Sequence, residues 1–247
     1  MISSKRISAL TTRNIKEILR DPLSLIFMFG LPVAMLILFY LIFHKLTPQF
    51  EMISLAPAMV PFGQSFAVLF TGMLIASDRA SSFMTRLFTT ETKPSEFIIG
   101  YMVSMIPVSL AQTALFLIVA GIIDFSFFSP FMLLGVVMSV FTAIFFISAG
   151  LLFGVITNEK AVGGVASGVV TCQSILSGMW FPPEGLSATF LTIMKVLPFK
   201  NASLLMQNVL MGDFSFEGVW LPVIIILLYS AAIFAVSVLV YKKKMKG

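Results

Sequence analysis

The chain consists mainly of apolar segments that are long enough to cross a lipid bilayer, separated by short polar interruptions. A crossing helix takes about 20 apolar residues, so little of the chain is left for a soluble domain. Of its 247 residues, 58% are hydrophobic and only 11% are charged, whereas soluble domains average roughly 25% charged residues. The sequence therefore predicts an all-α polytopic membrane protein, with a single transmembrane domain over residues 1–247. Six spans are expected, at residues 22–43, 54–76, 97–123, 130–156, 161–180 and 219–241.

Residues 1–21 precede the first span and are rich in polar side chains. On a helix, Ile7 and Leu10 belong to an apolar arc, and Arg13 and Lys16 belong to a basic arc opposite it. This pattern is typical of an amphipathic helix lying in the lipid headgroup layer, which makes membrane lipid a partner. A solvated helix ahead of the membrane is the alternative.

The basic residues predict the orientation in the membrane. With six spans, both termini lie on one side, together with all but three of the 16 lysines and arginines. The exceptions are Lys45, Lys195 and Lys200. Cytoplasmic loops of membrane proteins carry the excess of basic residues, so we expect a multi-pass plasma membrane protein with both termini in the cytoplasm.

Several function classes lack their sequence signatures. There is no G-x-x-x-x-G-K-[ST] motif for ATP, and neither the single histidine, His44, nor the single cysteine, Cys172, has metal-binding neighbours in the sequence. Asp78 adjoins Arg79 at the end of a span, where pairing at the interface explains it. The net charge of +5 flanks the spans and does not indicate nucleic-acid binding. No catalytic, cofactor or metal site is expected in this chain.

Polar side chains within the second span need partners in hydrocarbon, so Gln64, Ser65 and Thr71 should face protein or a water-filled cavity. In the fifth span, Gly164, Ser167 and Gly168 form a small-residue stripe that permits close helix contact. Packing within the chain and contact with another subunit both explain that stripe.

The fifth span ends at a helix-breaking sequence, Trp180-Phe181-Pro182-Pro183-Glu184. The apolar parts of residues 181–212 are too short to cross the bilayer. Irregular backbone at membrane depth requires support from protein or a cavity. We expect residues 181–212 to form re-entrant helices that enter from the outer face and return to it.

The sequence LSGMWFPPEGL at 176–186, followed by Leu197-Pro198-Phe199, resembles the signature of type-2 ABC transporter permeases. Residues 1–21 resemble the elbow helix of that family, and residues 78–96 resemble its cytosolic coupling loop, ending in Arg86-Leu87 and Lys93-Pro94-Ser95-Glu96. The early part of the loop differs, because many members carry Glu-x-Gly-Thr where this chain reads RASSF at 79–83.

The resemblance implies a half-size membrane subunit of a type V exporter. It would pair with a second permease, identical or homologous, and with two nucleotide-binding ATPase subunits that hold ATP and Mg. The contacts to the ATPase would come from Arg79, Phe83, Arg86, Leu87, Phe88, Pro94 and Glu96. The translocation path would be lined by Gln64, Ser65, Thr71, Thr171, Gln173, Ser174 and Ser177. The outer gate would be formed by Trp180, Phe181, Pro182, Pro183 and Glu184.

No titratable group lines this expected path, which favours a hydrophobic or amphipathic cargo such as a drug, peptide or lipid. Flipping of a lipid-linked glycan is a related option. A passive channel or secondary carrier without ATP coupling is the alternative of a different class, and a membrane scaffold that does not transport is a third.

Overall fold

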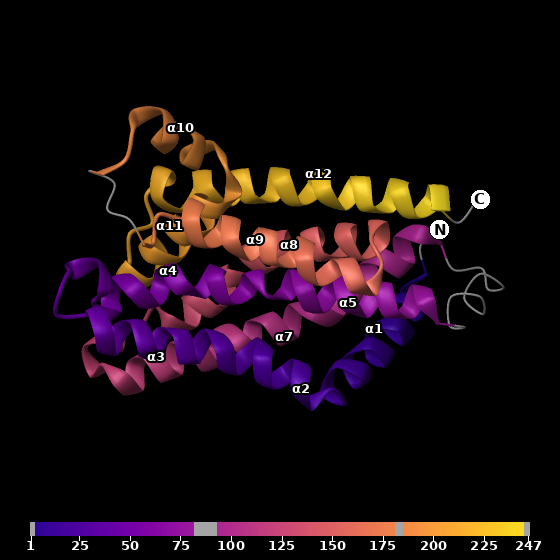
Figure 1. The fold of residues 1–247 in the computed structure, drawn as a ribbon, viewed down its shortest axis with the longest axis horizontal. Helices are drawn as coiled ribbons and strands as arrows, with labels where there is room; N and C mark the ends of the chain where they lie inside the picture. The colour runs from indigo at the N-terminus through magenta and orange to yellow at the C-terminus, as the bar shows by residue number, and fades with distance from the viewer. Residues whose placement is uncertain (1–2, 82–92, 181–184, 245–247) are drawn as a thin grey trace.

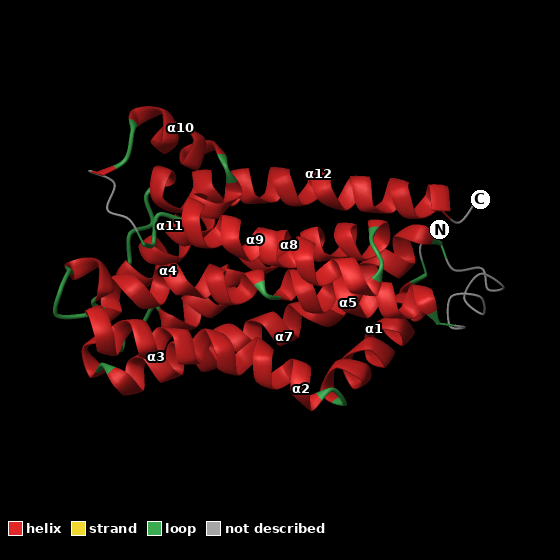
Figure 2. Ribbon diagram, in the orientation of Figure 1, coloured by secondary structure: helices red, strands yellow, loops and turns green. Residues whose placement is uncertain are grey.

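The computed structural model describes residues 3–81, 93–180 and 185–244, and within them every regular element is a helix (Figure 2). The first half of the chain contains α1 Ser4–Leu19, α2 Pro22–Leu25, η1 Ile26–Gly30, α3 Leu31–Phe43, η2 Pro48–Phe50, α4 Met52–Ser65, α5 Ala67–Ala80 and α7 Pro94–Ile123. The second half contains η3 Phe125–Phe127, α8 Met132–Ile156, α9 Glu159–Leu176, α10 Ala188–Val196, α11 Pro198–Met211, η5 Phe216–Trp220 and α12 Leu221–Lys244.

Five segments in the described part of the chain are long and apolar enough to cross a membrane. Since π-helical turns continue directly into α-helix, some of these segments join two or three elements. The five are Pro22–Phe43, Met52–Ala80, Pro94–Ile123, Met132–Ile156 and Phe216–Lys243. The prediction of an all-α polytopic membrane protein is therefore confirmed.

The span predicted at residues 161–180 corresponds to α9, which is not among those five. This helix has 18 residues and carries Glu159 and Lys160 in its first turn and Gln173 near its end. These polar residues lower its mean hydropathy below that of the other spans. Five helical segments therefore qualify as spans by length and composition, whereas α9 is a shorter and more polar helix that does not.

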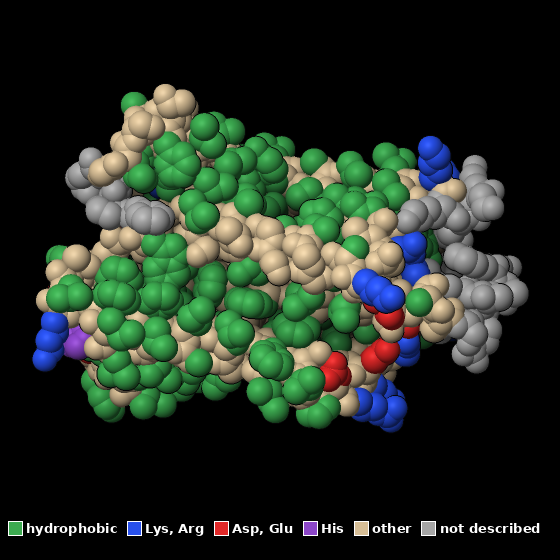
Figure 3. Space-filling view, viewed as in Figure 1, with side chains coloured by type: hydrophobic (Ala, Val, Ile, Leu, Met, Phe, Trp, Pro, Cys, Tyr) green, Lys and Arg blue, Asp and Glu red, His purple; other side chains and the backbone are tan. Residues whose placement is uncertain are grey.

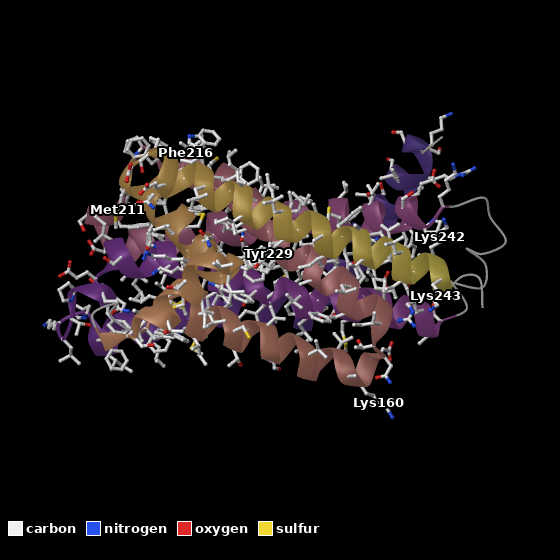
Figure 4. The ribbon with its side chains drawn as sticks, turned by 90° about the horizontal axis from the view of Figure 1, so that it is seen from above. Lys160, Met211, Phe216, Tyr229, Lys242 and Lys243 are labelled. Carbon is white, nitrogen blue, oxygen red and sulfur yellow. The ribbon has the colours of Figure 1, made fainter. Side chains whose placement is uncertain are left out.

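The helices form an elongated bundle with both termini at the same end (Figure 1). Figure 4 places Lys160, Lys242 and Lys243 at that end, and Met211 and Phe216 at the other. Five lengthwise passages would leave the termini at opposite ends. The helix α9, which begins next to Lys160, runs lengthwise and supplies the passage that the other five leave out. The short helices α10 and α11 stay at the far end, where α11 packs on α4 and α10 packs on α11 (Figure 1).

Glycines bring α5 and α8 into backbone contact at the centre of the bundle. A Cβ added at Gly154 would lie 2.7 Å from the carbonyl oxygen of Gly72, and one added at Gly150 would lie 2.8 Å from that of Val68. Small residues allow such approach between helices in a membrane, where close packing replaces the hydrophobic effect as the source of association. The pair α5–α8 is therefore the fixed core around which the other helices are arranged.

Candidate functional site

The helix α1 lies across the end of the bundle near the termini and packs on α7 (Figure 1). Leu10 is buried in this contact, and a Cβ added at Gly100 would lie 2.9 Å from the Cβ of Leu10. The Thr11 hydroxyl donates to the carbonyl of Gly100 at 3.2 Å. Part of the apolar side of α1 therefore faces protein.

A buried carboxylate joins α1 to the end of α5. Asp78 is 3% exposed, and the guanidinium of Arg13 binds it through both nitrogens, with Nη2 and Oδ1 2.5 Å apart. The hydroxyl of Tyr101 donates to the same carboxylate from α7. Charge-assisted, bidentate pairs of this kind are strong and directional. The interpretation that Asp78 pairs at the interface with its neighbour Arg79 is therefore wrong, since Asp78 binds Arg13 across 65 residues of sequence.

A second buried carboxylate joins α1 to the start of α7. Glu96 accepts hydrogen bonds from the backbone N–H of Lys93 at 2.9 Å and from that of Ser3 at 2.6 Å. Arg6 forms an ion pair with it at 3.5 Å. A carboxylate in the first turn of a helix also interacts favourably with the helix dipole. Glu96 therefore fixes the first turn of α7 and the first turn of α1 to each other.

Asp78 and Glu96 stand on either side of residues 82–92, so α1 holds the chain at both ends of that segment. Pro94 occupies the first turn of α7, where a missing N–H costs nothing. Four of the residues predicted to contact an ATPase subunit, Phe83, Arg86, Leu87 and Phe88, lie outside the described residues. The flanks of the predicted coupling loop are thus built from α1, α5 and α7 together.

Arg79, also predicted to contact the ATPase, turns towards α8. Its Nη1 donates to the carbonyls of Gly154 at 2.8 Å and Thr157 at 3.0 Å, with Val155 at 2.5 Å. The last carbonyls of a helix lack partners within the helix, and basic side chains satisfy them well. Arg79 therefore joins the ends of α5 and α8 next to the same flank.

The buried carboxylate of Asp78 shifts the pKa of two side chains of α1, Arg13 and Glu17. Burial lowers the pKa of Arg13, but the hydrogen bond to Asp78 and the charge of Asp78 outweigh it and raise the pKa. Burial and the charge of Asp78 raise the pKa of Glu17, against the opposite effect of Arg13.

Within the described residues, no group of three or more His, Cys, Asp or Glu side chains is placed to hold a metal.

The predicted path residues of the second span lie inside the bundle. Gln64 is 1% exposed; its Nε2 donates to Thr113 Oγ1 at 2.9 Å and to the carbonyl of Ser139 at 3.2 Å, while Thr142 donates to its Oε1. Gln64 thereby ties α4 to α7 and α8. Ser65 and Thr71 are also buried, with Ser65 bonded to the carbonyl of its own helix at Phe62.

Gln112 is a structural residue that the sequence analysis missed. Its Nε2 donates to the carbonyl of Met28, in the π-helical turn η1, and to the carbonyl of Gly63 in α4, at 2.7 and 3.0 Å. Backbone groups freed by helix irregularity at membrane depth need such partners. The rule applied to Gln64, that a polar residue in a span requires a partner, would also have identified Gln112 and Thr113.

The fifth-span candidates divide between a buried and an exposed face of α9. Gln173 is buried and donates to Ser203 Oγ of α11 at 3.2 Å. Thr171 is exposed and donates to the carbonyl of Ser167 at 2.8 Å. A Cβ added at Gly164 or Gly168 would meet nothing within 4 Å. The small-residue stripe therefore makes no close packing with the described part of this chain.

The far end of α9 leads into an aromatic cluster made of Phe39, Phe43, Phe50, Phe62 and Trp180. Gly178 has a φ of +78°, a conformation suited to glycine, and it turns the chain after the helix. The Trp180 ring lies 4.3 Å from that of Phe39, and its Nε1 donates to Ser174 Oγ at 2.5 Å. Ser177 donates to the carbonyl of Ser174 at 3.2 Å.

This cluster brings the chain after α9 together with α3, η2 and α4. The side chain of Gln49 adds a polar contact, because its Nε2 donates to the carbonyl of Met179 at 2.5 Å. The other residues predicted for the outer gate, Phe181, Pro182, Pro183 and Glu184, lie outside the described residues.

A comparison with protein-family models finds that the model of the ABC-2 type transporter matches residues 5–211. That range begins in α1, includes the loop between Asp78 and Glu96, and ends with α11. A comparison with curated proteins gives no match.

Proposed function

Because the chain belongs to the ABC-2 type transporter family, we propose that it pairs with a second permease subunit, identical or homologous, in an ATP-driven exporter of hydrophobic or amphipathic compounds. The chain itself is a multi-pass permease, and ATP binding in this family is on separate subunits. Two such ATPase subunits with Mg would supply the energy, and the substrate path would lie between the two permeases.

The observation that carries this proposal is the attachment of α1 on both sides of residues 82–92. Asp78 and Glu96 are buried, and each binds a basic residue of α1. Because α1 is bonded on both sides of residues 82–92, a force applied to this segment can be passed to the spans without first pulling its two ends apart. A docking loop for an ATPase needs this property, whereas a passive channel has no use for it.

The orientation follows from charge. Basic side chains gather at the end of the bundle where the termini lie, and few lie at the opposite end (Figure 3). From the positive-inside rule we propose that this end, with α1 and residues 82–92, faces the cytoplasm and that the chain lies in the plasma membrane. The aromatic cluster around Trp180 would lie at the outer end and serve as part of the outer gate.

The exposed face of α9 provides a surface for the second permease. Gly164, Ser167, Gly168 and Thr171 leave a shallow surface along the helix, and two such surfaces can approach closely in lipid. Closed two-fold pairing places the same face of α9 on both sides of the interface. The path between subunits would then run beside α9.

The test is reconstitution with a candidate ATP-binding subunit in lipid vesicles. The chain alone should show no ATPase activity, and the complex should hydrolyse ATP and accumulate substrate in inside-out vesicles. Replacing residues 82–92 by a Gly-Ser linker should abolish both assembly and transport. A matched replacement of residues 45–47, at the other end of the bundle, should leave assembly intact. Transport that continues without ATP and without residues 82–92 would overturn the proposal in favour of a passive channel or secondary carrier.

A further inference from the structure

A cavity of about 300 Å³ opens beside α1 at the end of the bundle where the termini lie. It is formed by the end of α1, by α2 and η1, by one side of α5 from Phe70 to Ser77, and by the first residue of α9. Ligand pockets in proteins have volumes of roughly 300–1,000 Å³, so the cavity can hold a small organic molecule.

Three carboxylates lie around this cavity, at Glu17, Asp21 and Glu159, and no described lysine or arginine lines it. The chain as a whole has an excess of basic residues, with a net charge of +5. Acidic side chains are visible in Figure 3 near the α1–α2 corner. Asp21 also caps α2 by accepting from the N–H of Ser24, and Glu159 lies in the first turn of α9. These local roles explain Asp21 and Glu159 separately, but they do not require the two residues to meet Glu17 at one cavity.

The nearby basic residues lie outside the lining of this cavity. Arg13 pairs with Glu17 at 2.7 Å, but the same guanidinium binds Asp78 through both nitrogens. One positive charge thus serves two carboxylates. Glu17 also lines a hollow along α1 together with Lys16 and Arg20, and Glu159 lines another between α5 and α9 together with Lys160.

Part of the cavity wall is apolar. Met28, Phe70 and Leu74 line it, and Met28 is 1% exposed. On a helix with a rise of 1.5 Å per residue, Phe70 lies about 10 Å further along α5 than Ser77. Methionine adapts to varied apolar shapes, and an aromatic ring attracts a nearby cation. Negative charge therefore occupies one end of the cavity, and adaptable apolar surface occupies the other.

We propose that this cavity is the entry site for the substrate and that it selects amphipathic organic cations. The positive group would lie among Glu17, Asp21 and Glu159, and the apolar body would contact Phe70, Leu74 and Met28. The inference rests on the proposed export function, and it specifies the substrate class that the family match leaves open. An anionic amphiphile of the same shape is excluded by the carboxylates.

The test is equilibrium binding of tetraphenylphosphonium to the purified permease–ATPase complex in detergent, with tetraphenylborate as an anion of the same shape. The complex should bind the cation and not the anion. The triple variant Glu17→Gln, Asp21→Asn, Glu159→Gln should lose about tenfold in affinity for the cation, because exposed charge pairs contribute modestly one by one. Asparagine still caps a helix, so α2 should persist.

The matched control removes three carboxylates from the opposite end, with Asp124→Asn, Asp213→Asn and Glu217→Gln, and it should bind the cation normally. Equal binding of cation and anion, or an equal loss in the control, would overturn the proposal. So would native affinity for the cation in the triple variant. Binding of phosphatidylethanolamine by a complex that binds no tetraphenylphosphonium would identify a lipid site instead and would overturn the proposal too.

Failure of the export function is detected separately. In that case the complex would lack ATPase activity or ATP-dependent uptake of every compound, whereas cation binding does not require the motor. If ATPase activity and assembly are intact while the cation does not bind, the entry-site proposal fails and the permease assignment stands.

Discussion

Arg13 of α1 binds Asp78 of α5 through both guanidinium nitrogens, and this pair attaches the N-terminal helix to the flank of residues 82–92. Asp78 also accepts from Tyr101, so three helices meet at one buried carboxylate. At the other end of residues 82–92, Glu96 of α7 forms an ion pair with Arg6 of α1. Asp78 and Glu96 thus attach α1 to both flanks of residues 82–92, the predicted coupling loop.

The first prediction concerns Arg13→Met. It leaves the carboxylate of Asp78 buried without its cation, and loss of one partner of a buried pair costs about 3 kcal/mol at the lower end of measured values. The melting temperature of the permease should fall, and in the complex ATP hydrolysis should no longer drive transport. Adding Asp78→Asn should recover much of the stability. Arg20→Met, on the exposed end of α1, is the control and should behave as the native chain. Equal stability of Arg13→Met and the control would contradict the role given to the pair.

The second prediction separates structural polar residues from path residues. Gln64→Leu removes an amide that bonds to two other helices, so we expect a loss of about 2 kcal/mol in unfolding free energy. Its substrate profile should stay unchanged, because the side chain does not reach a surface. Thr171→Val, on the exposed face of α9, should alter transport while hardly changing the melting temperature. A changed substrate profile in Gln64→Leu with native stability would place Gln64 in the path after all.

Much of the architecture could be predicted from particular residues. The apolar runs identified the membrane class. The end of the fifth span was predicted at residues 180–184, of which the structure describes only Trp180, and the helix α9 ends before it, at Leu176. The fifth span was harder, because Glu159, Lys160 and Gln173 make α9 polar for its length. Its lengthwise position depends on packing against α5 and α8, which hydropathy does not describe.

The charge pairs could not be predicted. Arg13 was assigned to a basic arc facing away from the apolar side, and nothing local to it indicates that Asp78 lies opposite. Such pairing depends on how α1 packs on α7, where Leu10 contacts Gly100 and Thr11 bonds to its carbonyl. The proximity of Arg79 to Asp78 in sequence was misleading for the same reason, since successive residues on a helix point in different directions.

The third prediction uses two glycines that differ in surroundings. Gly168→Leu adds a side chain where a Cβ meets nothing within 4 Å, so the chain should fold but fail to form a permease pair. Gly154→Leu forces α8 away from the Gly72 carbonyl 2.7 Å from the new Cβ, so it should not fold stably. Analytical ultracentrifugation and melting temperature distinguish the two effects.

The same interface can be tested by cross-linking. Cys172 is exposed on the face of α9 that carries Gly168. In a homodimer with a two-fold axis along this face, mild oxidation should link Cys172 of the two subunits, and Gly168→Leu should reduce the yield. Efficient pairing without any cross-link, together with a native dimer in Gly168→Leu, would move the interface to another helix.

The final prediction is a pH dependence at Glu17. Burial and the charge of Asp78 raise its pKa above the ordinary value of 4.5, so the folded chain binds this proton more tightly than the unfolded chain does. The ionised form therefore opposes folding at neutral pH, and the opposition disappears as pH falls below the raised pKa. Glu17→Gln should be slightly more stable than the native chain at pH 7, with the difference vanishing near pH 4. Its half-exposed position keeps the effect small. Melting curves across this range are the measurement, with Glu51→Gln at the other end of the bundle as the control. A variant less stable than the native chain at pH 7 would mean that the ion pair with Arg13 outweighs burial and the repulsion from Asp78.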